Sequence, residues 1–450
     1  MKSTRRLFLK NGAVAVASVG LAPAWGPDFV RNTAFAAEPQ RNGRAAGGRK
    51  VLICLFQRGA VDGLSMVVPH GDANYYQHRS TGNGIAIPRT GPGSLIDLDG
   101  TFGLHPALAP LKSIWDEGHL AAIHACGSPN PTRSHFDAQD FMESGAPGNK
   151  QVRDGWLSRV LCCPEDAARL QSTPFRGVSM TSQLPQSLQG KADALAIPDL
   201  RTFGVKDSSA AAMIANSMNN KNMGGKSTPG GAAAGFEALY DQAVGDVLHG
   251  AGKESFEAIK MIQGLNPGTY QPARGAQYPR GRFGESLQQI AQLIKADVGL
   301  EVGFAEMGGW DTHVNQGATQ GRLARQLQEF GEGIKALYLD LGDRMADVTI
   351  LTMSEFGRTV RQNGNGGTDH GHATCFFTLG DKVNGGKVLG QWPGLAPEQL
   401  YENRDLAVTT DFRAVFGEIV QKHMGVRDLQ AVFPGYASPT SQFRNVLKSA

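Results

Sequence analysis

The stretch Val51-Leu52-Ile53-Cys54-Leu55-Phe56, followed by Gln57-Arg58-Gly59-Ala60-Val61-Asp62-Gly63, indicates how this chain folds. A continuous apolar run that ends in a glycine-bounded turn is typical of a strand buried on both faces. Such strands belong to parallel sheets covered by helices on either side. We therefore expect Val51 to Phe56 to be the first central strand of an α/β domain.

The rest of the chain alternates between strand-like and helix-like segments. Short apolar runs predict strands at 119–124, 300–306, 348–353 and 375–379, and helical periodicity predicts helices at 106–117, 134–144, 283–296, 318–341 and 411–423. This alternation favours a mostly parallel central sheet covered by helices on both faces.

The pattern weakens between about 165 and 275. Residues 208–234 are rich in Ala, Gly, Ser, Asn and Met, 236–263 has helical periodicity, and 272–282 is a Pro/Gly/Arg loop. We interpret the interval as an inserted, partly helical cap with a flexible linker. The expected organisation is a single domain over 38–450 that carries this cap.

The N-terminus has the features of an export signal. Arg5-Arg6 precede a weakly apolar Gly/Ala/Val stretch and the small residues Ala34-Phe35-Ala36-Ala37, which together predict a twin-arginine signal peptide over 1–37. The alternative is the charged start of a cytosolic helix. Because the apolar run is shorter than the ~20 residues that span a bilayer, we expect no membrane anchor. The expected location is periplasmic or secreted, and the export machinery would be a partner.

The charge of the chain follows from this segment. The formal net charge is +3, and removal of 1–37, which carries five basic residues and one acidic residue, leaves −1. Without a basic stripe or interleaved aromatic residues, a nucleic-acid partner is not expected. The five cysteines are too few and too irregular for a disulfide framework, and Cys54 and Cys375 lie in apolar runs typical of the core.

Polar residues follow the predicted strands where ligands bind in open α/β sheets. Asp62 follows the first strand, the segment 131–135 follows the second, Asp311 and His313 follow a later one, and Glu355 with Arg358 follow 348–353. The spacing of Glu355 and Arg358 also suits an ordinary ion pair on a helix.

Two Asp/His clusters carry the strongest chemical signal. Gly308-Gly309-Trp310-Asp311-Thr312-His313 and Gly367-Thr368-Asp369-His370-Gly371-His372 offer carboxylate and imidazole groups, the ligands that zinc, manganese and iron accept. In extended segments, residues two apart project to the same side, so the clusters suit strand-end or loop ligands. The alternative is a pair of solvated loops.

Ser134 is the candidate nucleophile. It precedes a predicted helix, where free backbone N–H groups and the helix dipole favour an anion. The alternative is a plain N-cap serine with Asp137 at the third helical position.

The motifs together resemble those of a known family. The residues that carry the resemblance are 56–64, 131–137, 308–313, 354–359 and 367–372. Across about 50–425 the chain looks like the DUF1501 family of exported proteins, which is grouped with the alkaline-phosphatase-like fold.

The resemblance implies a site with one or two metal ions. Asp62, Ser134 or Thr132, Asp369 and His370 would surround one ion, and Asp311, His313 and His372 would hold a second, while Arg133 or Arg358 would clamp the substrate oxygens. The ion would be zinc, with manganese, iron or calcium as alternatives. Whether Thr132 or Ser134 aligns with the nucleophile stays open.

The implied function is hydrolysis of a small-molecule or glycan ester, phosphate before sulfate. Pro129 occupies the position where sulfatases carry their modified Cys or Ser, which disfavours a sulfatase. The late His423 lies on a predicted amphipathic helix and suits a packing or surface role rather than that of a metal ligand. Two rivals are a non-catalytic metal- or glycan-binding envelope protein and a phosphotransferase or mutase. Nothing in the sequence indicates the number of subunits.

Overall fold

A central sheet of nine strands organises the chain in this computed structural model, which describes residues 49–82, 84–163, 173–203, 258, 261–262, 264–437 and 440–448. The strands are β1 (Val51–Gln57), β5 (Leu120–Gly127), β6 (Gly177–Ser179), β7 (Ala194–Ala196), β8 (Val302–Met307), β9 (Val348–Met353), β10 (Thr374–Leu379), β11 (Lys387–Leu389) and β12 (Thr410–Asp411). Their order is β11-β5-β10-β9-β1-β8-β6-β7, and β12 also pairs with β5.

The sheet is parallel except at one strand. β1 runs parallel to both of its neighbours, β8 and β9, whereas β10 runs antiparallel to β9 and to β5. The amino end of β10 therefore lies at the same edge as the carboxyl ends of the other central strands. The predicted mostly parallel α/β sheet is confirmed.

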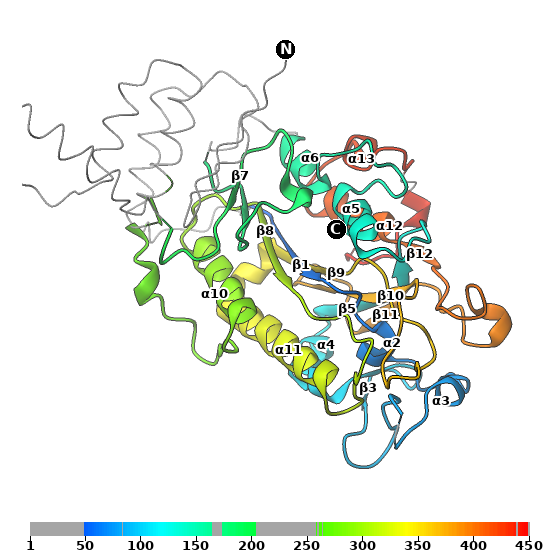
Figure 1. The fold of residues 1–450 in the computed structure, drawn as a ribbon. Coiled ribbons are helices and arrows are strands. Elements are labelled where there is room, and N and C mark those ends of the chain that lie inside the picture. The colour runs from blue at the N-terminus through cyan, green and yellow to red at the C-terminus, as the bar shows by residue number, and fades with distance from the viewer. Residues whose placement is uncertain are drawn as a thin grey trace, which may run out of the picture.

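Helices cover both faces of the sheet, as the sequence predicts (Figure 1). The longer ones are α5 (His135–Ser144), α6 (Trp156–Cys162), α10 (Arg282–Lys295), α11 (Arg322–Leu341) and α12 (Phe412–Lys422). The shorter ones are α2 (Gly63–Met66), α3 (Tyr75–His78), α4 (Lys112–Asp116) and α13 (Leu429–Val432). The 3-10 helices among the described residues are η1 (Pro106–Leu111), η3 (Gln186–Leu188), η4 (Pro267–Thr269), η5 (Gly342–Asp347), η6 (Pro397–Gln399) and η7 (Thr440–Gln442). A small separate sheet contains β2 (Val67–Val68), β3 (Ile96–Asp97) and β4 (Gly103–Leu104).

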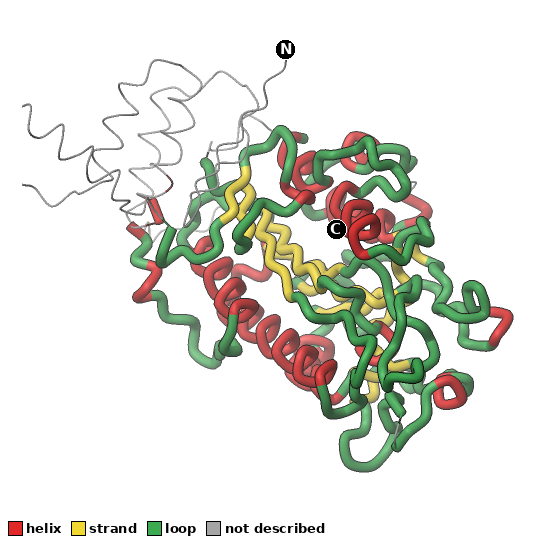
Figure 2. The backbone as a smooth tube through the Cα atoms, in the orientation of Figure 1, coloured by secondary structure: helices red, strands yellow, loops and turns green. Residues whose placement is uncertain are grey.

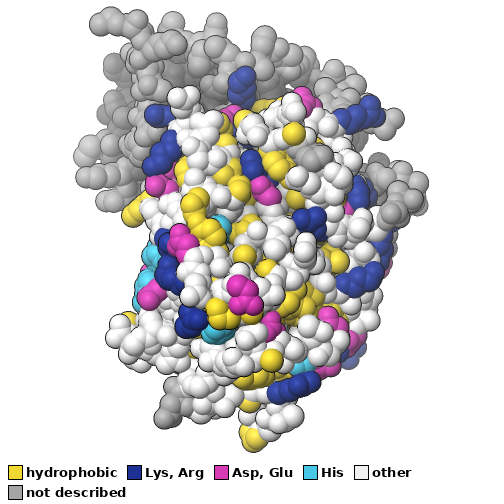
Figure 3. All heavy atoms as spheres, turned by 90° about the vertical axis from the view of Figure 1, so that its right-hand side faces the viewer, with side chains coloured by type: hydrophobic (Ala, Val, Ile, Leu, Met, Phe, Trp, Pro, Cys, Tyr) yellow, Lys and Arg dark blue, Asp and Glu magenta, His cyan; other side chains and the backbone are white. Residues whose placement is uncertain are grey.

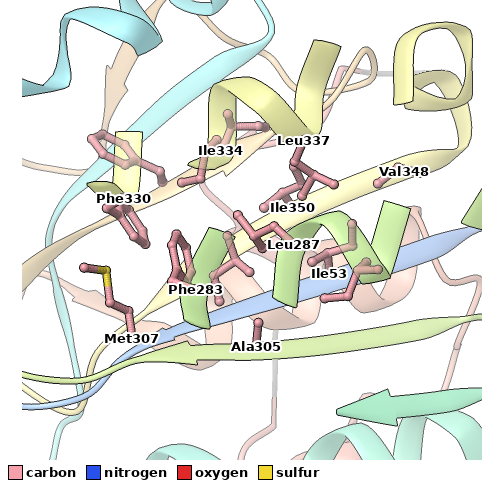
Figure 4. Close-up of a cluster of buried hydrophobic side chains, with 14 of the residues drawn as sticks. Ile53, Phe283, Leu287, Ala305, Met307, Phe330, Ile334, Leu337, Val348 and Ile350 are labelled. Atoms are coloured by element: carbon pink, nitrogen blue, oxygen red, sulfur yellow. The ribbon is translucent and has the colours of Figure 1, made fainter. Parts of the chain in front are cut away.

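Alternation along β1 divides the core into two layers. Ile53 and Leu55 face α10 and α11 and belong to the same buried cluster as Leu287, Phe330 and Ile334 of these helices. Figure 4 shows part of this cluster. The intervening side chains, such as Cys54, face α6 and α12 on the other side. Because side chains alternate along a strand, a strand between two helical layers must be apolar at every position.

α11 shows why its sequence forms a helix on this face. The buried residues Leu323, Leu327, Phe330, Ile334 and Leu337 recur at intervals of three and four, which places them on one stripe. In a strand, residues at these intervals would fall on both faces of the sheet, so this pattern specifies a helix. Leu341 ends the stripe just before Gly342.

The interval predicted to be a cap contributes to the central sheet in its first part. β6 and β7 extend the sheet beyond β8, and residues 204–257, the central part of the proposed cap, lie outside the described residues. The proposed signal peptide over 1–37 also lies outside them. Among the helices of the described part of the chain, none has the length and apolar character needed to cross a membrane.

The cysteines behave as core residues where the sequence places them in apolar runs. Cys54 and Cys375 are buried, and all five cysteines are free. Long loops gather beyond the carboxyl ends of the strands, on the right of Figure 2.

Candidate metal centre

Three loops and one helix start meet at the carboxyl edge of the sheet. Gly59 follows β1, Asp311 follows β8, Glu355 follows β9 and His135 begins α5 after β5. His370 precedes β10, and the reversed direction of that strand places it at the same edge. Figure 3 looks onto this side of the molecule and shows His side chains among mixed acidic and basic ones.

Three histidine rings converge on one carboxylate oxygen. The Nε2 atoms of His135, His313 and His370 lie 3.6, 3.1 and 3.4 Å from Oδ1 of Asp311. The Nε2 atoms of His313 and His370 are 2.9 Å apart. The ligand atoms of His135, Asp311 and His370 all lie within 4.8 Å of one another, a spacing that could hold one metal ion.

The opposite nitrogen of each ring is bound by an acceptor. Nδ1 of His135 lies 2.8 Å from Glu355 Oε1, Nδ1 of His313 lies 2.9 Å from Asp369 Oδ1, and Nδ1 of His370 lies 2.8 Å from the Arg133 carbonyl oxygen. An acceptor at Nδ1 fixes the proton there and leaves a lone pair on Nε2.

This arrangement fits a cation. Lone pairs on His313 and His370 that face each other at 2.9 Å repel unless a proton or a metal ion lies between or beside them. The Nε2 atom of His135 is buried without a hydrogen-bond partner. Neutral imidazoles whose far nitrogens donate to carboxylates or carbonyls are the usual ligands of zinc and related metals.

Glu355 is the most buried acid of the centre. Its carboxylate accepts hydrogen bonds from the Gly59 backbone N–H at 2.9 Å, from Gln139 Nε2 at 2.9 Å and from His135. Burial acts to raise the pKa of Glu355, but these hydrogen bonds outweigh it and lower the pKa below its usual range. The hydrogen bond to Glu355 likewise raises the pKa of His135 against the effect of burial.

Arg358 holds the loops rather than pointing into open space. It is buried, and its guanidinium donates to the carbonyl oxygens of Gly59 at 2.6 Å, Ala60 at 2.8 Å and Thr368 at 3.0 Å. It also donates to Asp311 Oδ1. Burial acts to raise the pKa of Asp311, but Arg358 together with His313 and His135 lowers it below its usual range. Residues 354–358 form no helix, so Glu355 and Arg358 serve the site separately and are not a helical ion pair.

Asp369 contacts the centre through His313. Its Oδ1 also accepts from Asn363 Nδ2 at 3.0 Å. The hydrogen bond from Asn363, with that from His313, lowers the pKa of Asp369. Asp369 therefore orients a candidate ligand.

Two predicted ligands lie away from this group. Asp62 is fully buried in an ion pair with Arg79, with contacts of 2.8 and 3.0 Å. His372 is buried, its Nε2 lies 3.1 Å from the Ser128 carbonyl oxygen, and its ring packs against Tyr401. The structure thus brings together Asp311, His313 and His370, places Asp369 beside them, and does not bring Asp62 or His372 into the group.

The segment before α5 borders the centre. Ser134 is exposed and caps α5, because its Oγ accepts from the Asp137 backbone N–H at 3.4 Å. Thr132 Oγ1 accepts from the Ser134 backbone N–H at 3.3 Å. The Arg133 guanidinium binds Asp405 at 2.7 Å and Glu402 at 2.6 Å, while its carbonyl oxygen holds His370.

His135, Glu355 and Arg79 contribute more than sequence reasoning assigned to them. His135 and Glu355 lie in segments already singled out at strand ends, and that position was the available signal. Arg79 follows a short helix, α3, and no spacing in the sequence links it to Asp62.

The comparisons with known proteins give a family match over most of the chain and only distant matches among solved structures. The family model described as "Protein of unknown function (DUF1501)" matches residues 49–433. No curated protein matches the chain. The chain is similar to the PsFucS1 sulfatase from Pseudoalteromonas sp. at 11% identity, with a TM-score of 0.39, over 94% of this chain and 78% of that one. It is also similar to a mutant of the alkaline phosphatase PafA at 10% identity, with a TM-score of 0.29, over 70% of this chain and 64% of that one.

Proposed function

Since the chain belongs to the DUF1501 family, whose description assigns no activity, its function has to be argued from its own site, and we propose a metal-dependent hydrolase of phosphate esters. Sulfate esters are the second choice. The observation that carries the proposal is the convergence of three histidine Nε2 atoms on Asp311 Oδ1. The side chains of Asp311 and His313 are 42% and 38% exposed, so a substrate oxygen can reach this point.

The metal would be held by His135, Asp311, His313 and His370. Imidazole-rich sets suit zinc, with manganese or iron as alternatives, whereas calcium prefers oxygen ligands and fits this set least well. A bound divalent ion supplies Lewis acidity, which stabilises negative charge on phosphoryl oxygens.

The chain's own residues would position the reaction. Ser134 lies between Arg133, whose carbonyl holds His370, and His135, and its exposed hydroxyl stands at the amino end of α5. That helix end favours the substrate anion. Attack by the hydroxyl oxygen on phosphorus would form an Oγ–P bond as the ester P–O bond breaks and the proton passes to the leaving alcohol. Water would then release phosphate and restore the hydroxyl. Thr132 is the alternative nucleophile.

One observation favours the rival interpretation as a binding protein. The guanidinium groups of Arg133 and Arg358 are engaged by acidic side chains and backbone carbonyls, so neither stands free as an oxyanion clamp. A metal- or glycan-binding envelope protein would keep the cation site and need no such clamp. We propose export by the twin-arginine route for either function, because of Arg5-Arg6 and the small-residue stretch after them.

The test combines metal analysis with turnover. Protein expressed with its signal is purified and analysed for metal, then assayed on an aryl phosphate, a phosphodiester and an aryl sulfate. We expect turnover of the aryl phosphate, and loss of both metal and turnover in His135→Ala. Asp116→Asn, an exposed change remote from the centre, serves as control.

The nucleophile is tested separately. Ser134→Ala should abolish turnover while the metal stays bound, since the serine is not among the four ligands. Loss of turnover in Thr132→Ala but not in Ser134→Ala would transfer the role to Thr132. A metal-replete wild type without turnover on any of the three substrates would reject the hydrolase and support the binding protein.

A further inference from the structure

A buried ion pair adjoins the candidate metal centre. Asp62 and Arg79 are both fully buried, and the guanidinium meets the carboxylate through two hydrogen bonds of 2.8 and 3.0 Å. Arg79 also donates to the carbonyl oxygens of Val360 at 2.7 Å and Thr359 at 3.0 Å. A two-bond contact between guanidinium and carboxylate is the strongest geometry for such a pair.

The Asp62 carboxylate is already engaged by buried protein donors. Besides the two hydrogen bonds from Arg79, its Oδ2 accepts from Ser65 Oγ at 2.8 Å and from Gln316 Nε2 at 2.7 Å. Oδ2 thus accepts three hydrogen bonds and Oδ1 accepts one, and the fully buried carboxylate already has the Arg79 charge against it, which would repel a second cation. Burial acts to raise the pKa of Asp62, but Arg79 together with the hydrogen bonds from Ser65 and Gln316 lowers it below its usual range, so the carboxylate stays charged against its fixed partner.

Gln316 connects this pair to the ligand loops. Its Oε1 accepts from Thr312 Oγ1 and from Thr368 Oγ1, both at 2.7 Å. Thr312 lies between Asp311 and His313, and Thr368 directly precedes Asp369. A single amide therefore ties the Asp62–Arg79 pair to both segments that carry candidate ligands.

We propose that Arg79 is a fixed cation that takes the place of a second metal ion at Asp62. The centre then binds one exchangeable ion, through His135, Asp311, His313 and His370. Asp62, Arg79 and Gln316 are positioning residues that hold the two ligand loops. This inference requires the metal site but not hydrolytic activity, so it can be tested separately from the proposed activity.

The first experiment counts ions. Protein stripped with a chelator is reloaded with Zn²⁺ alone, freed of excess metal and analysed for zinc per chain. We expect one ion in the wild type and one in the double variant Asp62→Asn/Arg79→Met, which removes both buried charges together. Asp116→Asn is the surface control. A second ion in the wild type that the double variant loses would overturn the proposal.

A stability measurement distinguishes an ion-pair partner from a ligand. Asp62→Asn alone leaves the Arg79 charge buried and uncompensated, so it should melt at a lower temperature than the double variant. If both variants fail to fold, Gln316→Leu supplies the test. Loss of its link should weaken zinc binding by about tenfold with one ion still bound at saturation. Unchanged zinc affinity in Gln316→Leu would remove the positioning role.

Discussion

The chemistry of the centre depends on which nitrogen of each histidine carries the proton. Glu355, Asp369 and the Arg133 carbonyl each accept at an Nδ1 atom, so the three Nε2 atoms are all left to face Asp311. Each acceptor matters beyond the hydrogen bond that it forms, because it determines which ring nitrogen is free to bind a metal ion. Phe356 packs against the rings of His135 and His370 and keeps water from that side.

Glu355→Gln tests this dependence at one residue. The amide oxygen of the variant can still accept a hydrogen bond, but the negative charge that favours the Nδ1–H form of His135 is gone. The Gly59 backbone N–H and Gln139 also donate to this position and compete with His135 for the amide oxygen. We expect zinc affinity, measured by competition with a chelator, to fall about 10–100-fold. The control is Glu398→Gln, which changes an exposed acid in η6. Equal affinities in the two variants would rule out a role for Glu355 in holding the ring.

Sequence reasoning identified three of the four converging side chains but not their partners. Asp311, His313 and His370 follow from residue type and from position near strand ends. His135 needed the orientation of the first turn of α5, which periodicity does not give. Asp62 and His372 are residue types that could bind a metal, yet each is held by another group. Arg79 pairs with Asp62, and the Ser128 carbonyl lies against His372, and neither contact can be inferred from the sequence.

At the scale of elements, the reversal of β10 is what assembles the centre. Asp369 and His370 precede their strand, and in a wholly parallel sheet they would lie at the opposite edge from Asp311. Because β10 is antiparallel to β9 and β5, they lie beside it instead. An apolar run such as 374–379 predicts a strand but not its direction, so the position of Asp369 and His370 beside Asp311 could not be predicted from the sequence.

The loop between β9 and β10 must approach the Asp311 loop closely, and Gly367 allows it. A Cβ atom at Gly367 would lie 2.3 Å from the Thr312 carbonyl oxygen and 2.4 Å from the His313 carbonyl group. Gly367→Ala should therefore push the two ligand loops apart, lower the unfolding free energy by about 1–3 kcal/mol and weaken zinc binding. Gly364, in the same loop, has nothing within 4 Å, so Gly364→Ala is the matched control. Chemical denaturation and zinc competition on both variants decide the point, and similar behaviour of the two would contradict it.

Across the whole molecule, the fold was more predictable than the site because it rests on repeated patterns. β1 is buried at every position and apolar from Val51 to Phe56, and α11 repeats its buried stripe along its length, so each element carries redundant information. The short strands β6, β7, β11 and β12 span two or three residues each and left no such pattern. His423 shows the long-range limit. Of the packing or surface role predicted for it, the structure shows packing, but the group that it contacts, the Val51 carbonyl oxygen, lies 372 residues earlier in the chain.

The burial of His423 makes the stability of the folded protein depend on pH. His423, at the end of α12, is buried with its Nε2 2.9 Å from the carbonyl oxygen of Val51, where β1 begins. Burial lowers the pKa of His423 to about 4. In the unfolded chain the same group titrates near ~6.5, so between these values the unfolded state binds a proton that the folded state does not. Stability from this residue is therefore complete at neutral pH and is lost as the pH falls below the unfolded pKa. The loss reaches about 2 kcal/mol by roughly pH 5.

His423→Gln keeps a donor for the Val51 carbonyl and removes the titration. We expect the variant to be no more stable than the wild type at neutral pH, yet to lose about 2 kcal/mol less on acidification to roughly pH 5. Urea denaturation at the two pH values gives the comparison. His124, buried with a pKa lowered by burial to about 4, adds to the acid sensitivity of both proteins, so the variant should retain part of it. A wild type and variant with the same pH dependence would mean that His423 is protonated in the folded state, and the contact between α12 and β1 would then have to accommodate a buried charge.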